Sequence, residues 1–505
     1  MRVNRPNFHP MKLPRFALTA SFVFAALAAP LLAADDGWIS LFDGHSLAGW
    51  KAAEHPATFA VENGTIACGG QRGHLFYVGP DGKADFENFE LSVEVLTKPG
   101  TNSGVYFHAE WLDAGWPTQA GFEVQVDNSQ KEHGGYRENK MTGSLYGVRN
   151  VYKPMAPDNE WFTMNVVVRR PRVEIRVNGV LVVDYVEPRE PFPAGAPKHN
   201  RLGHGTFALQ GHDPESKAYF RNLRVRPLPP GEDASVVRPT LDAAGAQRLA
   251  LGKDNFPLVD LHTHLKGGLT LEQVLKLSHE TGMGAGIATN GGQGFPIQND
   301  AAALAFLEVM KGQPVFIALQ AEGREWIRMF TKETRARFDY IFTDSMTWTN
   351  AAGKRLRLWI PAEADIGPDP QAFMEELVAK AVQIISTEPI DIYVNPTFLP
   401  DSIAARYDEL WTDARMQKVI AAAVQHGVAI EINARYKIPS EHFIRLAKAA
   451  GAKFTIGTNN TSAKDYGDWS YPMEMQKKVG LTWKDMWVPG HEPSRAQRDL
   501  MNVAN

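Results

Sequence analysis

The sequence predicts two folded parts, an all-β sandwich of jelly-roll type followed by an α/β barrel of seven strands. Residues 37–228 contain short alternating strands and turns and lack long helical periodicity. Residues 256–490 instead contain seven continuous apolar runs of strand length, separated by amphipathic segments of helix length. The stretch 229–255 opens with prolines and a glycine, which indicates a linker, and residues 491–505 are expected to form a tail.

The first 34 residues are predicted to be an export signal. A short basic region, Met11 to Arg15, precedes the apolar, small-residue stretch Phe16 to Ala34, and Asp35 and Asp36 follow. This order is typical of a secretory signal peptide that is cleaved near Ala33 or Ala34. A retained membrane anchor is the alternative, but small residues before an acidic pair favour cleavage. We therefore expect an exported protein, periplasmic or secreted, with no stable membrane insertion.

Composition limits the classes of partner. The chain has 505 residues, a formal net charge of −4 and 44% hydrophobic residues, as in an ordinary globular protein. It has no basic stripe, so nucleic acid is not expected as a partner, and no motif predicts a nucleotide cofactor. Cys68 is the single cysteine. An intramolecular disulfide is thus excluded, and Cys68 is expected to be a small buried residue. Nothing here predicts the oligomeric state.

Alternation of apolar and polar residues predicts the strands of the sandwich. Residues 89–95 alternate with a period of two, which is typical of a half-buried strand. Asn178-Gly179 between the runs 173–177 and 180–183 is a strong hairpin signal. The runs 207–210 and 219–225 are expected to be closing strands.

Some sandwich strands carry a polar face that suits an oligosaccharide. On each strand, residues two apart share a face. The side chains expected on the polar face are Glu123, Gln125 and Asp127 of one strand, Tyr106 and His108 of a second, and Gln210 and His212 of a third. A sheet lined by such groups predicts a groove for a small saccharide substrate, and an ordinary solvent-facing sheet is the alternative. Glu123 and Asp127 are four residues apart, about 13 Å along a strand. An ordinary glycosidase pair lies roughly 5–9.5 Å apart, so that chemistry is not expected within this strand.

A set of short motifs in the first half resembles the 3-keto-disaccharide hydrolase family. The motifs are Ile39-Ser-Leu-Phe-Asp-Gly44, Gly49-Trp50, Asn102-Ser-Gly-Val-Tyr106, Phe122-Glu-Val-Gln125, Thr142-Gly-Ser-Leu-Tyr146 and Phe220-Arg-Asn-Leu223. The resemblance implies an exported concanavalin-like sandwich that acts on 3-keto-glycosides by lyase, hydratase or hydrolase chemistry. Such chemistry needs a base and an enolate stabiliser. The candidates are Glu123 or His108 as the base, with His212, Tyr146 or a metal stabilising the oxyanion.

The barrel half is predicted from its seven apolar runs, at 258–261, 286–288, 315–319, 340–342, 390–394, 428–432 and 454–456. An open sheet is the alternative to a closed barrel. Working groups in a barrel lie at the C-terminal ends of the strands. Every predicted strand end here carries a polar group. The first strand carries Asp260, His262 and His264. The polar groups at the ends of the later strands are Asn290, Glu322, Asp344, Asn395, Glu431, Asn433, Asn459 and Asn460.

His262 and His264 lie two residues apart, which places both imidazoles on one face of a strand. With Glu322 and Asp344 they are the candidate ligands of one divalent metal, Zn, Mn or Fe. A pair of histidines hydrogen-bonded in the core is the alternative. Arg435 follows a strand end and is a candidate for holding an anion or a sugar acid, against a solvated arginine.

The same half resembles the PHP (polymerase and histidinol phosphatase) family at Val259-Asp-Leu-His-Thr-His264, Ala321-Glu-Gly323 and Glu431-Ile-Asn433. This resemblance implies a distorted, TIM-like barrel of seven strands. The sequence departs from the family pattern at Asn290, Asn395 and Asn459, where histidine or aspartate elements are usual. Asparagine is a poor transition-metal ligand. We therefore expect either one metal ion or a metal-free, asparagine-rich sugar pocket.

Three hypotheses of function follow. In the first, the sandwich cleaves 3-keto-glycosides and the barrel adds a second, metal-dependent hydrolytic or isomerising step. In the second, the sandwich is a glycan-binding module and the barrel is the catalytic metallohydrolase. In the third, the barrel is a non-catalytic scaffold.

Overall fold

The computed structural model describes residues 37–117, 121–129, 131–190, 200–350 and 352–502. Residues from Trp38 onward form one compact unit. The predicted export signal, residues 1–34, lies outside the described residues. Within the described ranges, no helix has both the length and the apolar character needed to cross a membrane.

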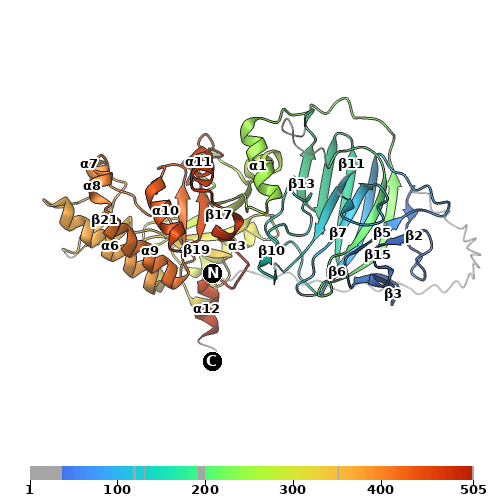
Figure 1. Ribbon diagram of the computed structural model, residues 1–505. Helices are drawn as coiled ribbons and strands as arrows, with labels where there is room; N and C mark the ends of the chain where they lie inside the picture. Colours follow the sequence, from blue (N-terminus) through green and yellow to red (C-terminus); the bar gives the residue numbers. More distant parts are fainter. Residues whose placement is uncertain (1–36, 118–120, 130, 191–199, 351, 503–505) are drawn as a thin grey trace, which may run out of the picture. The chain divides into compact units, whose positions relative to one another are not determined.

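One antiparallel sheet of the sandwich half has eight strands (Figure 1). Its path runs through β13 (Val180–Val186), β12 (Arg172–Val177), β11 (Phe162–Arg169), β6 (Phe89–Thr97), β15 (Lys217–Pro227), β4 (Thr65–Gly69) and β3 (Phe59–Glu62), and β1 (Ile39–Ser40) pairs with β15. The strands predicted at 89–95, 173–177, 180–183 and 219–225 are confirmed. Asn178 and Gly179 both have positive φ, 49° and 80°, as a tight hairpin turn requires.

The second sheet has five strands and carries the polar face that the sequence predicts. In order they are β2 (Trp50–Ala53), β5 (Gly73–Tyr77), β14 (Thr206–Gly211), β7 (Ser103–Ala109) and β8 (Phe122–Val126). A small hairpin, β9 (Glu132–His133) with β10 (Tyr136–Arg137), and the short helix η1 (Pro56–Thr58) complete this half.

Apolar residues of the two sheets pack against each other, which gives the sandwich its core. The ring of Phe89 on β6 lies 5.7 Å from that of Phe107 on β7 and 5.0 Å from that of Phe207 on β14. Cys68 is buried, as expected, and burial raises the pKa of its thiol. These sheets match a jelly-roll type of sandwich.

Seven parallel strands of the second half close into a barrel. They are β16 (Val259–Thr263), β17 (Gly284–Gly291), β18 (Phe316–Ala321), β19 (Tyr340–Thr343), β22 (Ile392–Tyr393), β23 (Ala429–Asn433) and β24 (Phe454–Gly457). Asp260 of β16 pairs with Ile456 of β24, so the first strand meets the last. The open-sheet alternative is therefore wrong. A side hairpin joins β20 (Thr347–Thr349) to β21 (Arg355–Arg357).

Helices alternate with these strands, as the amphipathic segments predict (Figure 1). This alternation brings the C-terminal ends of the parallel strands to one mouth of the barrel. The longer helices are α2 (Leu271–Thr281), α3 (Asp300–Met310), α6 (Pro370–Thr387), α9 (Asp413–His426), α10 (Glu441–Ala449) and α11 (Ser470–Val479). The shorter ones are α4 (Trp326–Met329), α5 (Lys332–Arg335), α7 (Asp401–Ala404), α8 (Tyr407–Leu410) and η3 (Trp483–Asp485).

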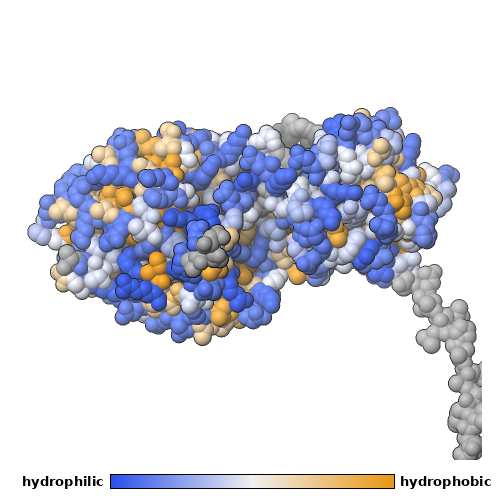
Figure 2. Space-filling view, turned by 90° about the horizontal axis from the view of Figure 1, so that it is seen from below, coloured by the Kyte–Doolittle hydropathy of each residue, from blue (hydrophilic) through white to orange (hydrophobic). Residues whose placement is uncertain are grey.

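Two segments expected to be a linker and a tail contain helices. Within 229–255 lies α1 (Ala243–Lys253), whose N-terminus is capped by the Asp242 side chain. Within 491–505 lies α12 (Arg495–Met501), anchored where the Arg495 backbone N–H donates to Asp391 at 2.7 Å. The face seen in Figure 2 is mostly hydrophilic, with apolar residues in scattered patches.

Candidate functional site

A cavity of about 600 Å³ lies against the five-stranded sheet of the sandwich. Five predicted site residues line it together: Glu123, Gln125, Tyr146, Gln210 and His212. Glu123 and Gln125 reach it because side chains two apart on β8 share one face. The remaining lining residues are Asn102, Gly115, Trp116, Gly147, Asn200 and Lys253.

Glu123 is the buried carboxyl group of this cavity, and its side chain reaches across the neighbouring strand β7. Nε2 of Gln210, on β14 beyond β7, donates to Oε1 of Glu123 at 3.1 Å and lies 2.6 Å from the hydroxyl of Tyr106. The strand between them offers room at Gly104, where an added Cβ would overlap Oε1 of Glu123. Glycine at this position therefore lets the carboxyl group lie over the sheet.

Burial sets the protonation of Glu123. Removal from water raises the pKa of its carboxyl group to about 8, and the negative charge of Glu138 acts in the same direction. Hydrogen bonds from Tyr106 and Gln210 oppose this rise. Burial also raises the pKa of Tyr106, which stays a neutral hydrogen-bond donor. A carboxyl group with a pKa near neutrality is suited to general acid–base chemistry.

Two amide oxygens in this cavity lack a partner. Within the described residues, Oε1 of Gln125 and Oε1 of Gln210 are buried and accept no hydrogen bond. The amide nitrogen of Gln125 is held by Asn102 at 3.1 Å, so its orientation is fixed. An unpartnered buried acceptor costs about 1–3 kcal/mol, which a hydroxyl group of a ligand would recover.

His212 and Trp116 form an aromatic wall of the cavity, with ring centroids 5.5 Å apart. Nδ1 of His212 is 2.8 Å from a carboxylate oxygen of Asp213. A carboxylate at this position fixes the tautomer with Nδ1–H and leaves Nε2 for another partner. Trp116 is 38% exposed and carries the guanidinium of Arg72 over its ring at 5.3 Å. Its exposed face suits stacking on a sugar ring.

Tyr146 belongs to a second buried cluster, which is centred on Glu138. The hydroxyl groups of Tyr136 and Tyr146 donate to Oε2 of Glu138 at 2.9 and 3.0 Å. Nζ of Lys140 lies 2.9 Å from Oε1 and 4.4 Å from the Tyr146 ring centroid. The ion pair is almost fully buried, with side chains 1% and 3% exposed. The Tyr146 proton is therefore directed at Glu138 rather than into the cavity.

The structure does not bring His108 to this cavity. Its φ of 53° rotates the residue at a register shift between β14 and β7. Nε2 of the ring lies 2.8 Å from the Glu87 carbonyl, and Nδ1 accepts the Gly203 N–H at 3.2 Å. The expectation that His108 shares a face with Tyr106 is therefore wrong, because the strand is not regular there. His108 has no ring nitrogen left to act as a base.

Asp127 and Tyr106 were also predicted to contact a substrate. Asp127 follows the end of β8, accepts the Ser129 N–H at 3.1 Å and does not line the cavity. Tyr106 is fully buried beneath Glu123 and Gln210, and acts on the cavity through them.

Besides two glycines, four cavity residues were not among the predicted site residues: Asn102, Trp116, Asn200 and Lys253. Asn102 and Trp116 lie just before β7 and in the loop after it, so a search of strand-flanking loops would have found them. Lys253 is the last residue of α1, in the predicted linker, and no local pattern marks it. Burial lowers the pKa of Lys253.

The predicted asparagine residues of the barrel form one hydrogen-bonded network with the carboxyl groups. Nδ2 of Asn290 donates to Gln320 at 3.0 Å and to Glu322 at 2.9 Å, and Nδ2 of Asn395 donates to Asp344 at 2.9 Å. Oδ1 of Asn395 in turn accepts from Asn433 at 3.0 Å and from Asn459 at 3.1 Å. A cavity of about 230 Å³ lies over Asn290, Gln320, Glu322, Asp344, Asn395, Arg435 and Asn459.

The donors proposed for a metal do not converge. Within the described residues, no group of three or more His, Cys, Asp or Glu side chains is arranged to hold a metal ion. Both ring nitrogens of His262 have partners, Glu431 at 2.5 Å and Gln320 at 3.3 Å. Nδ1 of His264 is 3.0 Å from the Ala288 carbonyl, and its Nε2 has no partner among the described residues. This arrangement fits the hydrogen-bonded alternative, and we derive no chemical step through a metal.

Comparison with known families covers the sandwich alone. Residues 37–226 match the 3-keto-alpha-glucoside-1,2-lyase-like domain. The first half of the chain therefore resembles a carbohydrate-active family. The match ends before the barrel, whose resemblance to the PHP family stays a prediction.

A 3-keto-disaccharide hydrolase of Bacteroides thetaiotaomicron is 26% identical over 231 residues, which cover 38% of this chain and 79% of that protein. Two solved structures of putative glycosyl hydrolases from Parabacteroides distasonis are also similar. One is 23% identical with a TM-score of 0.34 and covers 38% of this chain and 94% of its own. The other is 24% identical with a TM-score of 0.31, and the match covers 38% of this chain and 99% of that structure's chain.

Proposed function

We propose that the sandwich cleaves 3-keto-glycosides by elimination, with Glu123 as the base. The observation that carries this proposal is the placement of the Glu123 carboxyl group, which is buried in a cavity of about 600 Å³ and held by Gln210. A lone buried carboxyl with a pKa of about 8 suits proton abstraction from carbon better than a carboxylate pair for direct hydrolysis.

The reaction follows from the ketone at C3. The ketone acidifies the C2–H, so the Glu123 carboxylate takes that proton and the C2–H electron pair forms an enolate. The enolate then expels the C1 substituent, which leaves with a proton from solvent or from a cavity residue. The product is a 3-keto-2-hydroxyglucal. Addition of water across its C1–C2 double bond gives the free 3-keto sugar, so the net result is hydrolysis.

Negative charge develops on the C3 oxygen and must be stabilised there. We assign this role to Lys253, which lines the cavity. His212 donates from Nδ1 to Asp213, so its Nε2 carries no proton and accepts a hydroxyl group of the sugar instead. Tyr146 positions Glu138 and Lys140 instead of donating to the enolate. Trp116 stacks on the sugar, and the free amide oxygens of Gln125 and Gln210 accept its hydroxyl groups.

The alternative, a sandwich that only binds glycan for a catalytic barrel, needs no buried base of raised pKa. We also propose that the protein is exported, periplasmic or secreted, on the strength of the signal-like segment 11–34. This proposal concerns the sandwich, and it is compatible with either a catalytic barrel or a barrel that serves as a scaffold.

The test is turnover of a panel of 3-keto-glycosides by the full chain, with their non-oxidised parents as controls. Glu123→Gln keeps the shape of the side chain and removes the base, and we expect it to lower kcat by about 10²–10⁴. Glu110→Gln changes an exposed carboxylate just after β7 and should leave kcat unchanged. Undiminished turnover by Glu123→Gln, or equal turnover of the parent glycosides, would contradict the proposal.

A further inference from the structure

The mouth of the barrel holds a second polar cavity, and all the residues that line it lie outside the range 37–226 that matches the family model. It combines carboxyl groups and amides in its depth with an arginine and a lysine at its rim. From this arrangement we propose that the barrel binds a small sugar acid, that is, a polyhydroxylated carboxylate. The proposal is independent of the chemistry assigned to the sandwich.

The deep end of the cavity offers hydrogen-bond acceptors for hydroxyl groups. Glu322 accepts from Asn290 at 2.9 Å and from Thr347 at 3.1 Å, and Asp344 accepts from Asn395 at 2.9 Å and from the Met346 N–H at 2.8 Å. A carboxylate has about four acceptor sites, so each group can take further hydroxyl donors. Both side chains are about 4% exposed and are fixed by these bonds. Sugar hydroxyls match such an array.

The amides around these carboxyl groups hold one another in place. Asn433 and Asn459 both donate to Oδ1 of Asn395, and Oδ1 of the Asn433 side chain accepts the Tyr436 N–H at 2.9 Å. Asn433 also donates to Glu431 at 2.9 Å. A fully connected network of this kind is rigid, so the site is preformed.

The rim supplies positive charge. Lys266 and Arg435 both line the cavity and are exposed, and neither forms a salt bridge within the described ranges. Arg435 contacts the Tyr436 ring, 4.8 Å away, which orients its planar guanidinium. Arg324, the other arginine after a strand end, is instead bound to Glu388 at 2.9 Å and to Thr343 at 2.9 Å. Arg435 is thus available to a ligand, whereas Arg324 is not.

Charge also orients the ligand. Among the described residues that line the cavity, the cations lie at the exposed rim, where they attract an anion, and the buried bottom offers carboxyl and amide groups instead. The hydroxylated end of the ligand therefore lies deep and its anionic end lies at Arg435. A carboxylate fits the guanidinium fork with two parallel hydrogen bonds. As a monoanion it is also repelled less than a phosphate dianion by negative charge on the buried carboxyl groups.

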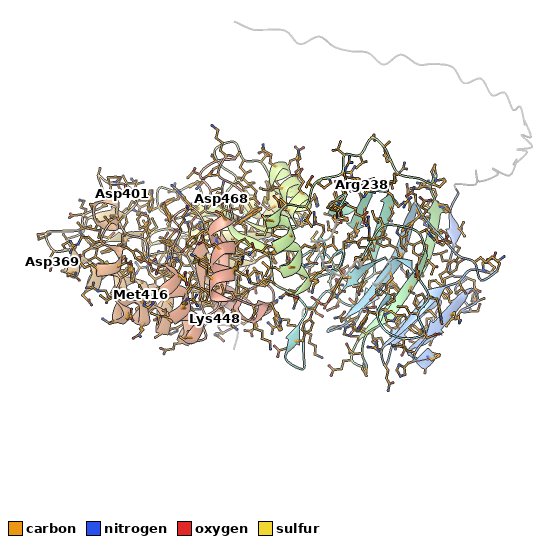
Figure 3. All side chains as sticks on the ribbon, turned by 45° about the horizontal axis from the view of Figure 1, so that its top comes forward. Arg238, Asp369, Asp401, Met416, Lys448 and Asp468 are labelled. Carbon is orange, nitrogen blue, oxygen red and sulfur yellow. The ribbon has the colours of Figure 1, made fainter. Side chains whose placement is uncertain are left out.

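A neighbouring cavity of about 600 Å³ shares Trp359, Arg435 and Tyr436 with this site. Asp401, at the start of α7, also lines it, and Figure 3 shows Asp401 toward the same end as Asp369, which caps α6. The Trp359 ring lies where the two cavities meet and offers a stacking surface. A sugar acid that forms the end of a longer glycan therefore has room to extend from the site.

The proposal is tested by isothermal titration calorimetry of the full chain with D-gluconate, D-glucuronate, D-glucose and glucose 6-phosphate. We expect one of the two sugar acids to bind with a Kd at least tenfold below that of glucose. Arg435→Gln and Lys266→Gln should each raise that Kd about tenfold, because each removes one rim charge without disturbing the core. Arg445→Gln, in an exposed pair with Glu441 on α10, is the matched control and should bind as the parent does.

Three results would overturn the proposal: no binding of either sugar acid, equal affinity for glucose, or tighter binding of glucose 6-phosphate than of both carboxylates. Glu123→Gln should bind the sugar acid as the parent does, which separates this site from the sandwich. Loss of binding in Glu123→Gln would place the sugar acid in the sandwich cavity and would also contradict the proposal.

Discussion

The side-chain nitrogen of Gln210 lies 3.1 Å from Oε1 of Glu123, although the strand β7 runs between their own strands β14 and β8. The bond is formed above Gly104 of that strand, where no side chain intervenes. This contact positions the proposed base, so it gives the most specific structural prediction.

Gly104→Ala should displace the Glu123 carboxyl group, because the new methyl group would occupy its position. We expect kcat on a 3-keto-glycoside to fall at least tenfold, since small misplacements of a catalytic group are costly. The matched control is Gly203→Ala, where an added Cβ meets nothing within 4 Å. Equal kcat values for the two variants, both folded by circular dichroism, would refute the role of Gly104.

The pH dependence of kcat/KM should report the ionisation of Glu123 in the free enzyme. The base acts as a carboxylate and its pKa is about 8. We therefore expect kcat/KM to rise about tenfold per pH unit below pH 8 and to level off above it. A profile that is already flat between pH 6 and 9 would argue against Glu123 as the base.

The same raised pKa makes a stability prediction. The folded state binds the Glu123 proton more tightly than the unfolded chain, whose glutamates have pKa values of about 4.3. The resulting stabilisation is complete below about pH 4.3 and is lost as the pH rises through about 8. The Tm of Glu123→Gln relative to the parent should therefore rise from pH 5 to pH 9, as measured by calorimetry. A constant difference would mean that the carboxyl group is not buried as described.

Lys253 tests whether a residue outside the matched domain completes the cavity. Lys253→Met keeps the length of the side chain and removes its charge. If the charge stabilises the enolate oxygen, kcat should fall about 10- to 100-fold with a smaller change in KM. Lys276→Met, on the exposed face of α2, is the control. Unchanged kcat in Lys253→Met would remove Lys253 from the mechanism.

Trp116 separates binding from chemistry. Trp116→Ala removes the stacking surface beside His212 but leaves the base in place. We expect KM to rise by about 10-fold or more while kcat changes little, since stacking acts on the ground state and the transition state alike. A large fall in kcat with unchanged KM would show that Trp116 acts instead by orienting His212.

Local patterns predicted the strands of the sandwich and of the barrel. The alternation at 89–95, the Asn178-Gly179 turn and the seven apolar runs each depend on near neighbours in the chain, and each corresponds to an observed strand or turn. The number of apolar runs, seven, favoured a closed barrel over an open sheet, and the barrel is closed. The helices α1 and α12 were not predicted, because their stability depends on contacts with distant segments such as that between Arg495 and Asp391.

The site was predictable only where the strands are regular. Glu123 and Gln125 follow the two-residue period and meet in the cavity. The prediction for His108 is wrong because its positive φ turns the ring away from the cavity. A one-residue irregularity of this kind leaves little trace in a sequence. Lys253 joins a cavity formed by residues more than a hundred positions earlier on β8. The Glu138 and Lys140 pair lies outside any long strand, so periodicity gave no signal.

The central claim, removal of the C2 proton by Glu123, is tested most directly with a 3-keto-glycoside deuterated at C2. Elimination predicts a primary isotope effect on kcat or kcat/KM and release of the deuterium to water at early times, with neither seen without enzyme. Both should disappear in Glu123→Gln along with turnover. A product that keeps the deuterium at C2, formed at the same rate as from the unlabelled substrate, would contradict the account.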